Sequence, residues 1–117
     1  MIIKNAERRA TLRPKSWGGE GELAGQHYLP ENAAESDSPF TMCAEMTLKP
    51  GHSIGVHTHD ANEEIYIILS GLGDYTDENG DIHRLHPGDM SLTRRGQSHG
   101  IKNPGTEPLT FMAVIAR

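Results

Sequence analysis

The sequence predicts an all-β protein, and two observations agree on this. Thirteen glycines and seven prolines occur among 117 residues, a content that favours many tight turns. Between the turns, apolar residues either alternate with polar ones or form short runs, and no long stretch has helical periodicity. Short strands separated by frequent turns are typical of an antiparallel sandwich or barrel.

The strands can be assigned in chain order from the local patterns. From Phe40 to Leu48 every second residue is apolar, which predicts a half-buried strand that ends at the Pro50-Gly51 turn. The Asn79-Gly80 pair predicts the turn of a β-hairpin. The remaining strands are expected at residues 56–60, 64–69, 73–76, 82–85, 90–93, 98–102 and 109–116.

Residues 1–25 differ from the rest of the chain. They are polar and glycine-rich, and Trp17 stands just before a Gly18-Gly19 turn. We expect this segment to be an extended arm that adds a strand to the barrel edge or to a neighbouring subunit. Residues 26–117 then form the barrel itself, as one domain without internal repeats.

Length and composition exclude several classes of function. The chain is long enough to bury a core as one domain. Its net charge is −5 and it has no basic block, so we expect neither nucleic acid nor a membrane surface as a partner. Cys43 is the single cysteine, which precludes an intrachain disulfide and favours a reducing, cytoplasmic location. No apolar run is long enough for a signal peptide or a membrane span.

Three histidines and a glutamate are the residues with the strongest chemical signal. His57 and His59 are two apart, so on one strand their side chains face the same way. Glu63 and Glu64 are neighbours, and strand alternation alone does not decide which of them joins the histidines. His99 is the best candidate for a further ligand from a distant strand. Imidazoles and a carboxylate together are typical ligands of a divalent transition metal.

These residues fall into two motifs that resemble those of the cupin superfamily, in particular its small single-domain members. The first motif, G-x5-H-x-H-x3,4-E-x6-G, is matched by Gly51, His57, His59, Glu64 and Gly71. The second, G-x5-P-x-G-x2-H-x3-N, is matched by Gly88, Gly96, His99 and Asn103, with Arg94 in place of the usual proline. The resemblance covers roughly residues 40–115, and its spacing selects Glu64 over Glu63.

The resemblance implies a double-stranded β-helix, the jelly-roll barrel of cupins, with His57, His59, Glu64 and His99 as metal ligands. It also implies a homodimer. Ile65, Ile67 and Leu69 are apolar although they face away from Glu64, and a strand that is apolar on both faces is covered on both. The second cover is either the N-terminal arm or another subunit.

Three further residues are candidates for the substrate pocket. Tyr66 shares the face of Glu64. Either its phenol forms a hydrogen bond with a metal-bound substrate, as a catalytic group, or Tyr66 is a wall residue of the pocket. Met46 faces inward and is expected to line the core or pocket. Arg94, before the His99 strand, either steers an anionic substrate at the barrel mouth or is an ordinary exposed arginine.

The ligand set indicates a function but not one reaction. Three imidazoles and one carboxylate suit Mn, Fe, Ni, Co or Zn and leave coordination positions open. The leading hypothesis is a metalloenzyme acting on a small polar molecule, as a dioxygenase-type enzyme with a redox metal or as a Lewis-acid isomerase or lyase with a redox-silent one. The alternative is a non-catalytic module that binds or senses a small molecule.

Overall fold

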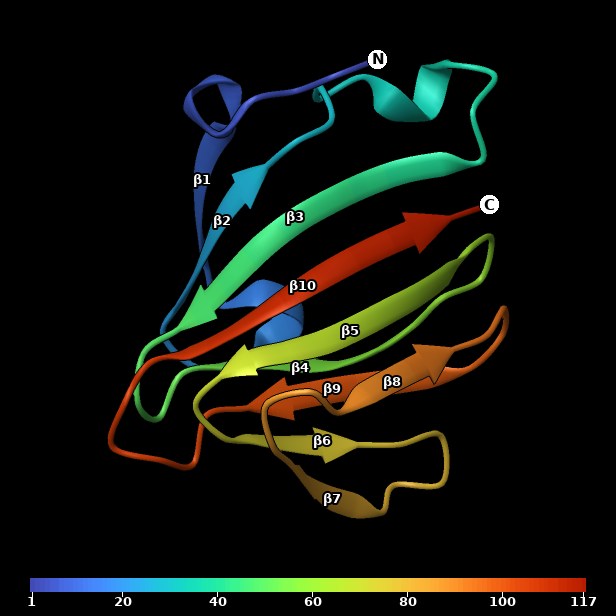
Figure 1. Ribbon diagram of the computed structural model, residues 1–117. Coiled ribbons are helices and arrows are strands. Elements are labelled where there is room, and N and C mark those ends of the chain that lie inside the picture. The colour runs from blue at the N-terminus through green and yellow to red at the C-terminus, as the bar shows by residue number, and fades with distance from the viewer.

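The computed structural model describes residues 1–117 and consists of two antiparallel β-sheets that face each other (Figure 1). The strands are β1 (Arg9–Pro14), β2 (Glu22–His27), β3 (Phe40–Leu48), β4 (Ser53–Thr58), β5 (Glu63–Ser70), β6 (Gly73–Thr76), β7 (Ile82–Leu85), β8 (Met90–Thr93), β9 (Ser98–Lys102) and β10 (Leu109–Ala116). Three short 3-10 helices, η1 (Asn5–Glu7), η2 (Ser16–Gly18) and η3 (Ala33–Glu35), lie in the connections. The predicted all-β jelly-roll fold is confirmed.

The sheets have six and four strands. The larger has the order β1-β2-β3-β10-β5-β8 and the smaller the order β4-β9-β6-β7. From β4 onward the chain crosses repeatedly from one sheet to the other. As a result β4 pairs with β9 in the smaller sheet, while β5 pairs with β8 in the larger. This alternation brings segments that are distant in sequence to the same space between the sheets.

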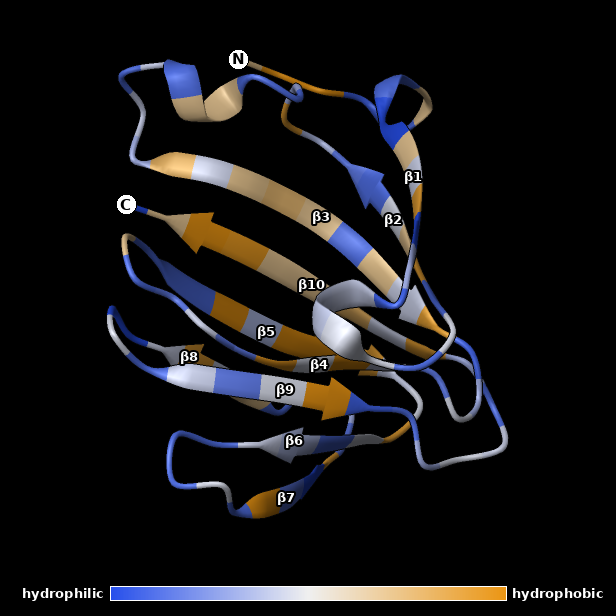
Figure 2. Cartoon of the chain, turned by 180° about the vertical axis from the view of Figure 1, so that it is seen from behind, coloured by the Kyte–Doolittle hydropathy of each residue, from blue (hydrophilic) through white to orange (hydrophobic).

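The core lies between the two sheets and follows the predicted alternation. On β3, Ala44, Met46 and Leu48 are buried while the residues between them are only partly covered. The same period places Tyr66 and Ile68 of β5 inside. The remaining buried apolar residues are Leu109, Phe111 and Ala113 from β10 and Ile54, Tyr75 and Ile101 from the smaller sheet. Figure 2 shows hydrophobic segments along β5 and β10.

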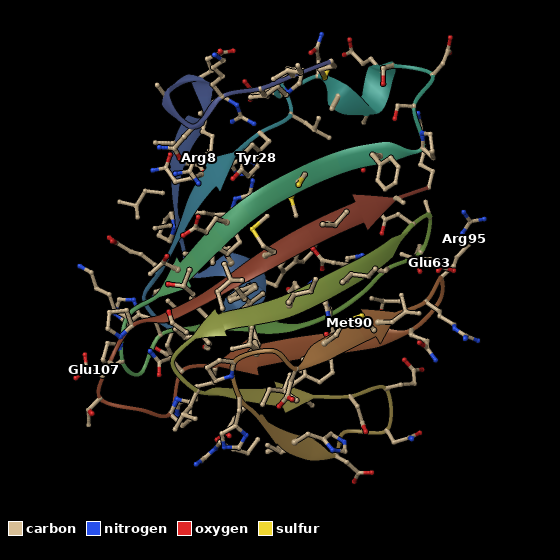
Figure 3. The ribbon with its side chains drawn as sticks, in the orientation of Figure 1. Arg8, Tyr28, Glu63, Met90, Arg95 and Glu107 are labelled. Atoms are coloured by element: carbon tan, nitrogen blue, oxygen red, sulfur yellow. The ribbon has the colours of Figure 1, made fainter.

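The N-terminal residues form a hairpin on the barrel of their own chain. Strands β1 and β2 pair along their whole length, and β2 pairs with β3 from Leu23↔Leu48 to His27↔Ala44. Arg8 fastens this hairpin, since its guanidinium bonds Glu45 at 3.0 Å and stacks over Tyr28 (Figure 3). The segment expected as an extended arm therefore supplies the outermost two strands at one edge of the larger sheet, and residue 25, the predicted end of the arm, lies inside β2.

The outer face of β5 and β8 is apolar and uncovered within the chain. Ile67 and Leu69 of β5 and Met90 and Leu92 of β8 are between 38% and 56% exposed. The N-terminal hairpin does not cover them, because β1 and β2 extend the opposite edge of the same sheet. Of the two covers predicted for this face, only a second subunit remains, and it stays a prediction. None of the helices has the length and apolarity needed to cross a bilayer.

Candidate metal centre

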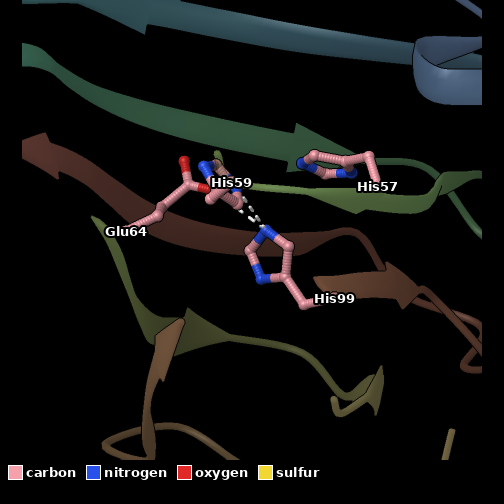
Figure 4. Close-up of side chains that lie close together, drawn as sticks. All are labelled: His57, His59, Glu64 and His99. Carbon is pink, nitrogen blue, oxygen red and sulfur yellow. Dashed lines mark hydrogen bonds and ion pairs between the residues drawn. The ribbon is translucent and has the colours of Figure 1, made fainter. Parts of the chain in front are cut away.

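Four side chains from both sheets converge between the layers (Figure 4). His57 comes from the end of β4, His59 follows that strand, Glu64 comes from β5 and His99 from β9. One nitrogen or oxygen atom of each lies within 4.8 Å of the others. His59, Glu64 and His99 are at most 8% exposed, while His57 is half-buried toward the opening. Glu63 points outward at the barrel periphery (Figure 3), so Glu64 is the carboxylate of the cluster.

The strand pairing explains why these residues meet. His57 and His99 are direct partners in the β4–β9 ladder, after an irregularity in register between Ile54 and His57. Strand β4 ends at Thr58, earlier than the sequence predicts. His59 is fixed instead by two hydrogen bonds of its backbone. Its N–H donates to the carbonyl of Gln97 at 2.9 Å, and its carbonyl accepts from Gly96 at 2.6 Å. Gly96 has a φ of +85°, a conformation that glycine adopts without strain.

Hydrogen bonds on the outer ring nitrogens orient the histidines. His57 Nδ1 donates to the carbonyl of Gly55 at 2.8 Å, and His59 Nδ1 donates to Asn62 Oδ1 at 2.6 Å. The Nδ1 of His99 lies 2.8 Å from Thr93 Oγ1 and 3.2 Å from the Tyr75 hydroxyl, both of which can accept its proton. With Nδ1 protonated, each neutral imidazole turns the Nε2 lone pair toward the cluster.

The inner atoms fit a bound cation. His59 Nε2 lies 2.9 Å from His99 Nε2, and Glu64 Oε1 lies 3.1 Å and 3.0 Å from these two nitrogens. Two nitrogen lone pairs and a carboxylate oxygen repel one another at such distances unless a proton or a cation lies among them. Three nitrogens and one oxygen form a set that divalent transition metals bind, so His57, His59, Glu64 and His99 could hold such an ion.

The electrostatics of the cluster suit this role. Burial lowers the pKa of His57, although its bond to Gly55 opposes this, so His57 remains neutral and able to ligate. The hydrogen bond to Glu64 raises the pKa of His59 against the effect of burial. Burial alone would raise the pKa of Glu64, but its bonds to His59 and His99 outweigh that effect and lower it. The carboxylate is therefore ionised at neutral pH.

A cavity of about 270 Å³ opens beside the cluster, close to the lower end of the usual range for small-molecule sites, about 300–1,000 Å³. Met46 and Tyr66, both predicted for the pocket, are among its lining residues. The Tyr66 ring stacks on His99 with the ring centres 4.8 Å apart. Burial, with the negative charge of Glu64, raises the pKa of Tyr66 well above its ordinary value, so the phenol keeps its proton.

The third residue predicted for the pocket lies elsewhere. Arg94 is exposed on the turn between β8 and β9, where its backbone N–H donates to Gln97 Oε1, and it does not line the cavity. The arginine that does line the cavity is Arg13, from the N-terminal hairpin. The difference arises because the turn before His99 points its side chains to solvent, a direction that spacing in the sequence does not specify.

Other residues near the cluster were not anticipated from the sequence. Ser16 and Trp17 of η2 line the cavity together with Arg13, and the Trp17 ring stacks on His57 at 4.7 Å with a 7° tilt. Asn62 and Thr93 orient His59 and His99. The one signal for η2 was a tryptophan before two glycines, and its pairing with His57 depends on how the hairpin folds back.

Comparison with known proteins identifies the family. The family model described as "Cupin domain" matches residues 44–115, which is more than half of the chain. The protein is a cupin. The oxalate-binding protein of Thermotoga maritima is 36% identical over 115 residues, which cover 98% of this chain and 93% of that protein. The (R)-mandelonitrile lyase of Granulicella tundricola is 30% identical over 81 residues, 69% of this chain and 61% of that protein.

Solved structures agree with this assignment. A crystal structure described as a predicted oxalate decarboxylase from Thermotoga maritima superposes on this cupin with a TM-score of 0.87, at 36% identity, covering 99% of this chain and 98% of that one. A double-stranded β-helix protein of uncharacterized function from Klebsiella pneumoniae has a TM-score of 0.67 at 27% identity, covering 79% and 74% of the two chains. The first match includes the N-terminal hairpin as well as the barrel.

Proposed function

We propose that this cupin holds a divalent transition metal through His57, His59, Glu64 and His99 and uses it to bind a small anion with two oxygen donors, of the oxalate class. The single observation that carries the metal proposal is the convergence of His59 Nε2, His99 Nε2 and Glu64 Oε1 within 3.1 Å. The ligand class is supported by the relative named oxalate-binding protein, which matches almost the whole chain.

The donor set also favours an anionic ligand. Three neutral imidazoles and one carboxylate leave a divalent ion with a net charge of roughly +1 and with open positions on a five- or six-coordinate ion. That positive charge attracts an anion, and a ligand with two oxygen donors fills adjacent positions. When bound, the metal supplies Lewis-acid polarisation, or redox chemistry if it is Mn or Fe. Zn, Ni and Co are equally compatible with these ligands.

Tyr66 is the residue of this chain that we propose to orient the ligand. Its phenol is protonated and buried in the cavity wall beside His99, so it can donate a hydrogen bond to an oxygen of a metal-bound anion. Met46 forms part of the apolar wall on the same side. An apolar wall excludes water and strengthens the electrostatic attraction of the anion for the metal.

Lewis-acid lyase activity is the second candidate function. The similarity to (R)-mandelonitrile lyase over 81 residues favours it. Among the cavity-lining residues the one carboxylate besides Glu64 is Asp60, which is exposed, so the site offers no buried general base apart from its ligands. That arrangement suits binding, or chemistry driven by the metal, better than proton abstraction by a side chain.

Two measurements test the proposed function. Elemental analysis of the purified protein should find one divalent transition metal per chain, and His99→Ala should lose most of it. Calorimetric titration of the metal-loaded protein with oxalate should then show binding that the metal-free protein lacks. Full metal occupancy in His99→Ala would refute the ligand assignment. Oxygen consumption when oxalate-loaded protein meets air, or loss of oxalate over time, would establish turnover instead of binding.

A further inference from the structure

The turn between β1 and β2 forms a wall of the cavity that the metal ligands do not account for. Ser16 and Trp17 of this turn and Arg13 near the end of β1 line the cavity; we call these three residues the cavity turn. The turn belongs to the N-terminal hairpin, whose two strands join the barrel at the far edge of the larger sheet. It reaches the metal site because η2 lies against β4, the strand that carries His57 (Figure 2).

The contact between the turn and β4 is too close to be incidental. A Cβ atom on Gly55 would collide with the carbonyl oxygen of Trp17, and one on Gly19 would collide with the carbonyl oxygen of Ser53. Ser53 N–H donates to the Glu20 carbonyl at 2.9 Å, and Glu20 N–H donates to Ser53 Oγ at 2.9 Å. Glycine on both sides permits this approach, and the hydrogen bonds fix the turn over the ligand strand.

The backbone of the turn is strained. Lys15 and Trp17 have φ values of +47° and +53°, and they are the two non-glycine residues of the chain with positive φ. Non-glycine residues rarely adopt this region, and those held there gather at binding and catalytic sites. In this backbone conformation two consecutive side chains point in different directions. Ser16 is buried, whereas Trp17 stacks on His57 at the mouth of the cavity.

The side chains of the turn lack partners that a ligand would supply. Ser16 is 4% exposed, and its hydroxyl has no hydrogen-bond partner in the protein, although buried hydroxyls nearly always have one. Arg13 is exposed and makes no ion pair or side-chain hydrogen bond within the chain, and it is the one lysine or arginine that lines the cavity. Trp17 is 63% exposed, so its indole forms an open edge of the site next to a metal ligand.

We propose that the cavity turn is the part of the site that recognises the ligand's outward end. The Ser16 hydroxyl donates to, and the Arg13 guanidinium pairs with, the anionic oxygens that are turned away from the metal, while Trp17 closes the side next to His57. This inference rests on the proposed function, because it assumes an anion held at the four-residue cluster. It assigns specificity to the N-terminal hairpin and leaves metal binding to the barrel.

The test compares the loss of a positive charge from the cavity turn with the loss of one from a neighbouring residue that does not line the cavity. Arg13→Gln and Lys15→Gln each remove one positive charge, but Lys15 does not line the cavity. Metal content is measured first, and each metal-loaded variant is then titrated with oxalate. Arg13→Gln should keep its metal and lose about tenfold in oxalate affinity, the effect of one hydrogen bond to a charged group. Lys15→Gln should change less than about twofold, and Arg13→Lys should recover part of the loss.

Ser16→Ala gives an independent readout. Without oxalate the variant should be at least as stable as the wild type, because it removes an unpartnered buried hydroxyl. With oxalate its melting temperature should rise less than that of the wild type. Equal oxalate affinity in wild type and Arg13→Gln, or an equal rise in Ser16→Ala, would overturn the role of the turn. Absence of oxalate binding by the metal-loaded wild type would instead overturn the ligand class, and the turn's role with it.

Discussion

Replacing Thr93 with valine is expected to weaken metal binding about fivefold to tenfold without disturbing the barrel. Thr93 is 2% exposed, and its hydroxyl lies 2.8 Å from His99 Nδ1, opposite the nitrogen that faces the metal. Valine has nearly the same shape but offers no acceptor for the Nδ1 proton. The orientation of the ring, and the basicity of its Nε2, then depend on the Tyr75 hydroxyl alone at 3.2 Å.

The magnitude follows from these contacts. A net hydrogen bond contributes about 0.5–1.5 kcal/mol, and about 1.4 kcal/mol corresponds to tenfold in affinity. Loss of a group that orients a metal-binding histidine usually costs about 10–100-fold. The Tyr75 hydroxyl also loses its own 2.7 Å contact with Thr93 and can serve His99 better, which places the expected effect at the low end.

The assay measures metal affinity by competition with a chelator of known affinity, whose absorbance or fluorescence reports how much metal it holds. Thr47→Val is the matched control, because Thr47 lies on β3 and bonds Thr110 at 3.4 Å, away from the site. Circular dichroism should show both variants folded. Unchanged metal affinity in a folded Thr93→Val protein would refute the argument that the hydroxyl holds His99 in its ligating orientation.

Other predictions address the metal, the pH and the surface. Trp17 is the one tryptophan in the chain and stacks on His57, so its fluorescence should be quenched by Co²⁺ or Ni²⁺, and a constant signal on loading would contradict the stacking. Because Glu64 raises the pKa of His59, protons should compete with the metal from above the usual histidine value of about 6.5; affinity should fall as the pH drops through that range, as titrations at several pH values would show. A homodimer across the β5–β8 face should dissociate in Leu92→Glu in analytical ultracentrifugation, whereas a wild-type monomer would exclude this interface.

The barrel could be predicted from local alternation, and the four-residue cluster from the spacing of the cupin motifs, which selects Glu64 over Glu63 where strand alternation does not. Alternation over residues 40–48 marks an inward face wherever that strand packs. The spacing of His57, His59, Glu64 and His99 is fixed by two short turns and by strand pairing, and all four meet in the structure.

The cavity wall could not be predicted in this way. Whether Arg13 or Arg94 lines the cavity is determined by the path of the hairpin over β4, which depends on contacts between Gly55 and Trp17 across some forty residues of chain. The roles of Thr93 and Tyr75 depend likewise on how hydroxyl groups from the two sheets approach His99. Side-chain partners at long sequence separation have no periodic signature.

The two halves of the site are carried by different parts of the chain. Strands β4, β5 and β9, together with His59 just after β4, supply every proposed metal ligand. The N-terminal hairpin, whose turn contains Trp17, supplies a wall of the cavity, and its strands lie at one edge of the larger sheet. Mutations in the hairpin turn can therefore change which molecule fits without altering how the ion is held. A protein built in this way can acquire new ligands through its first two dozen residues while the ligand-bearing strands stay unchanged, one physical route by which a single fold hosts many functions.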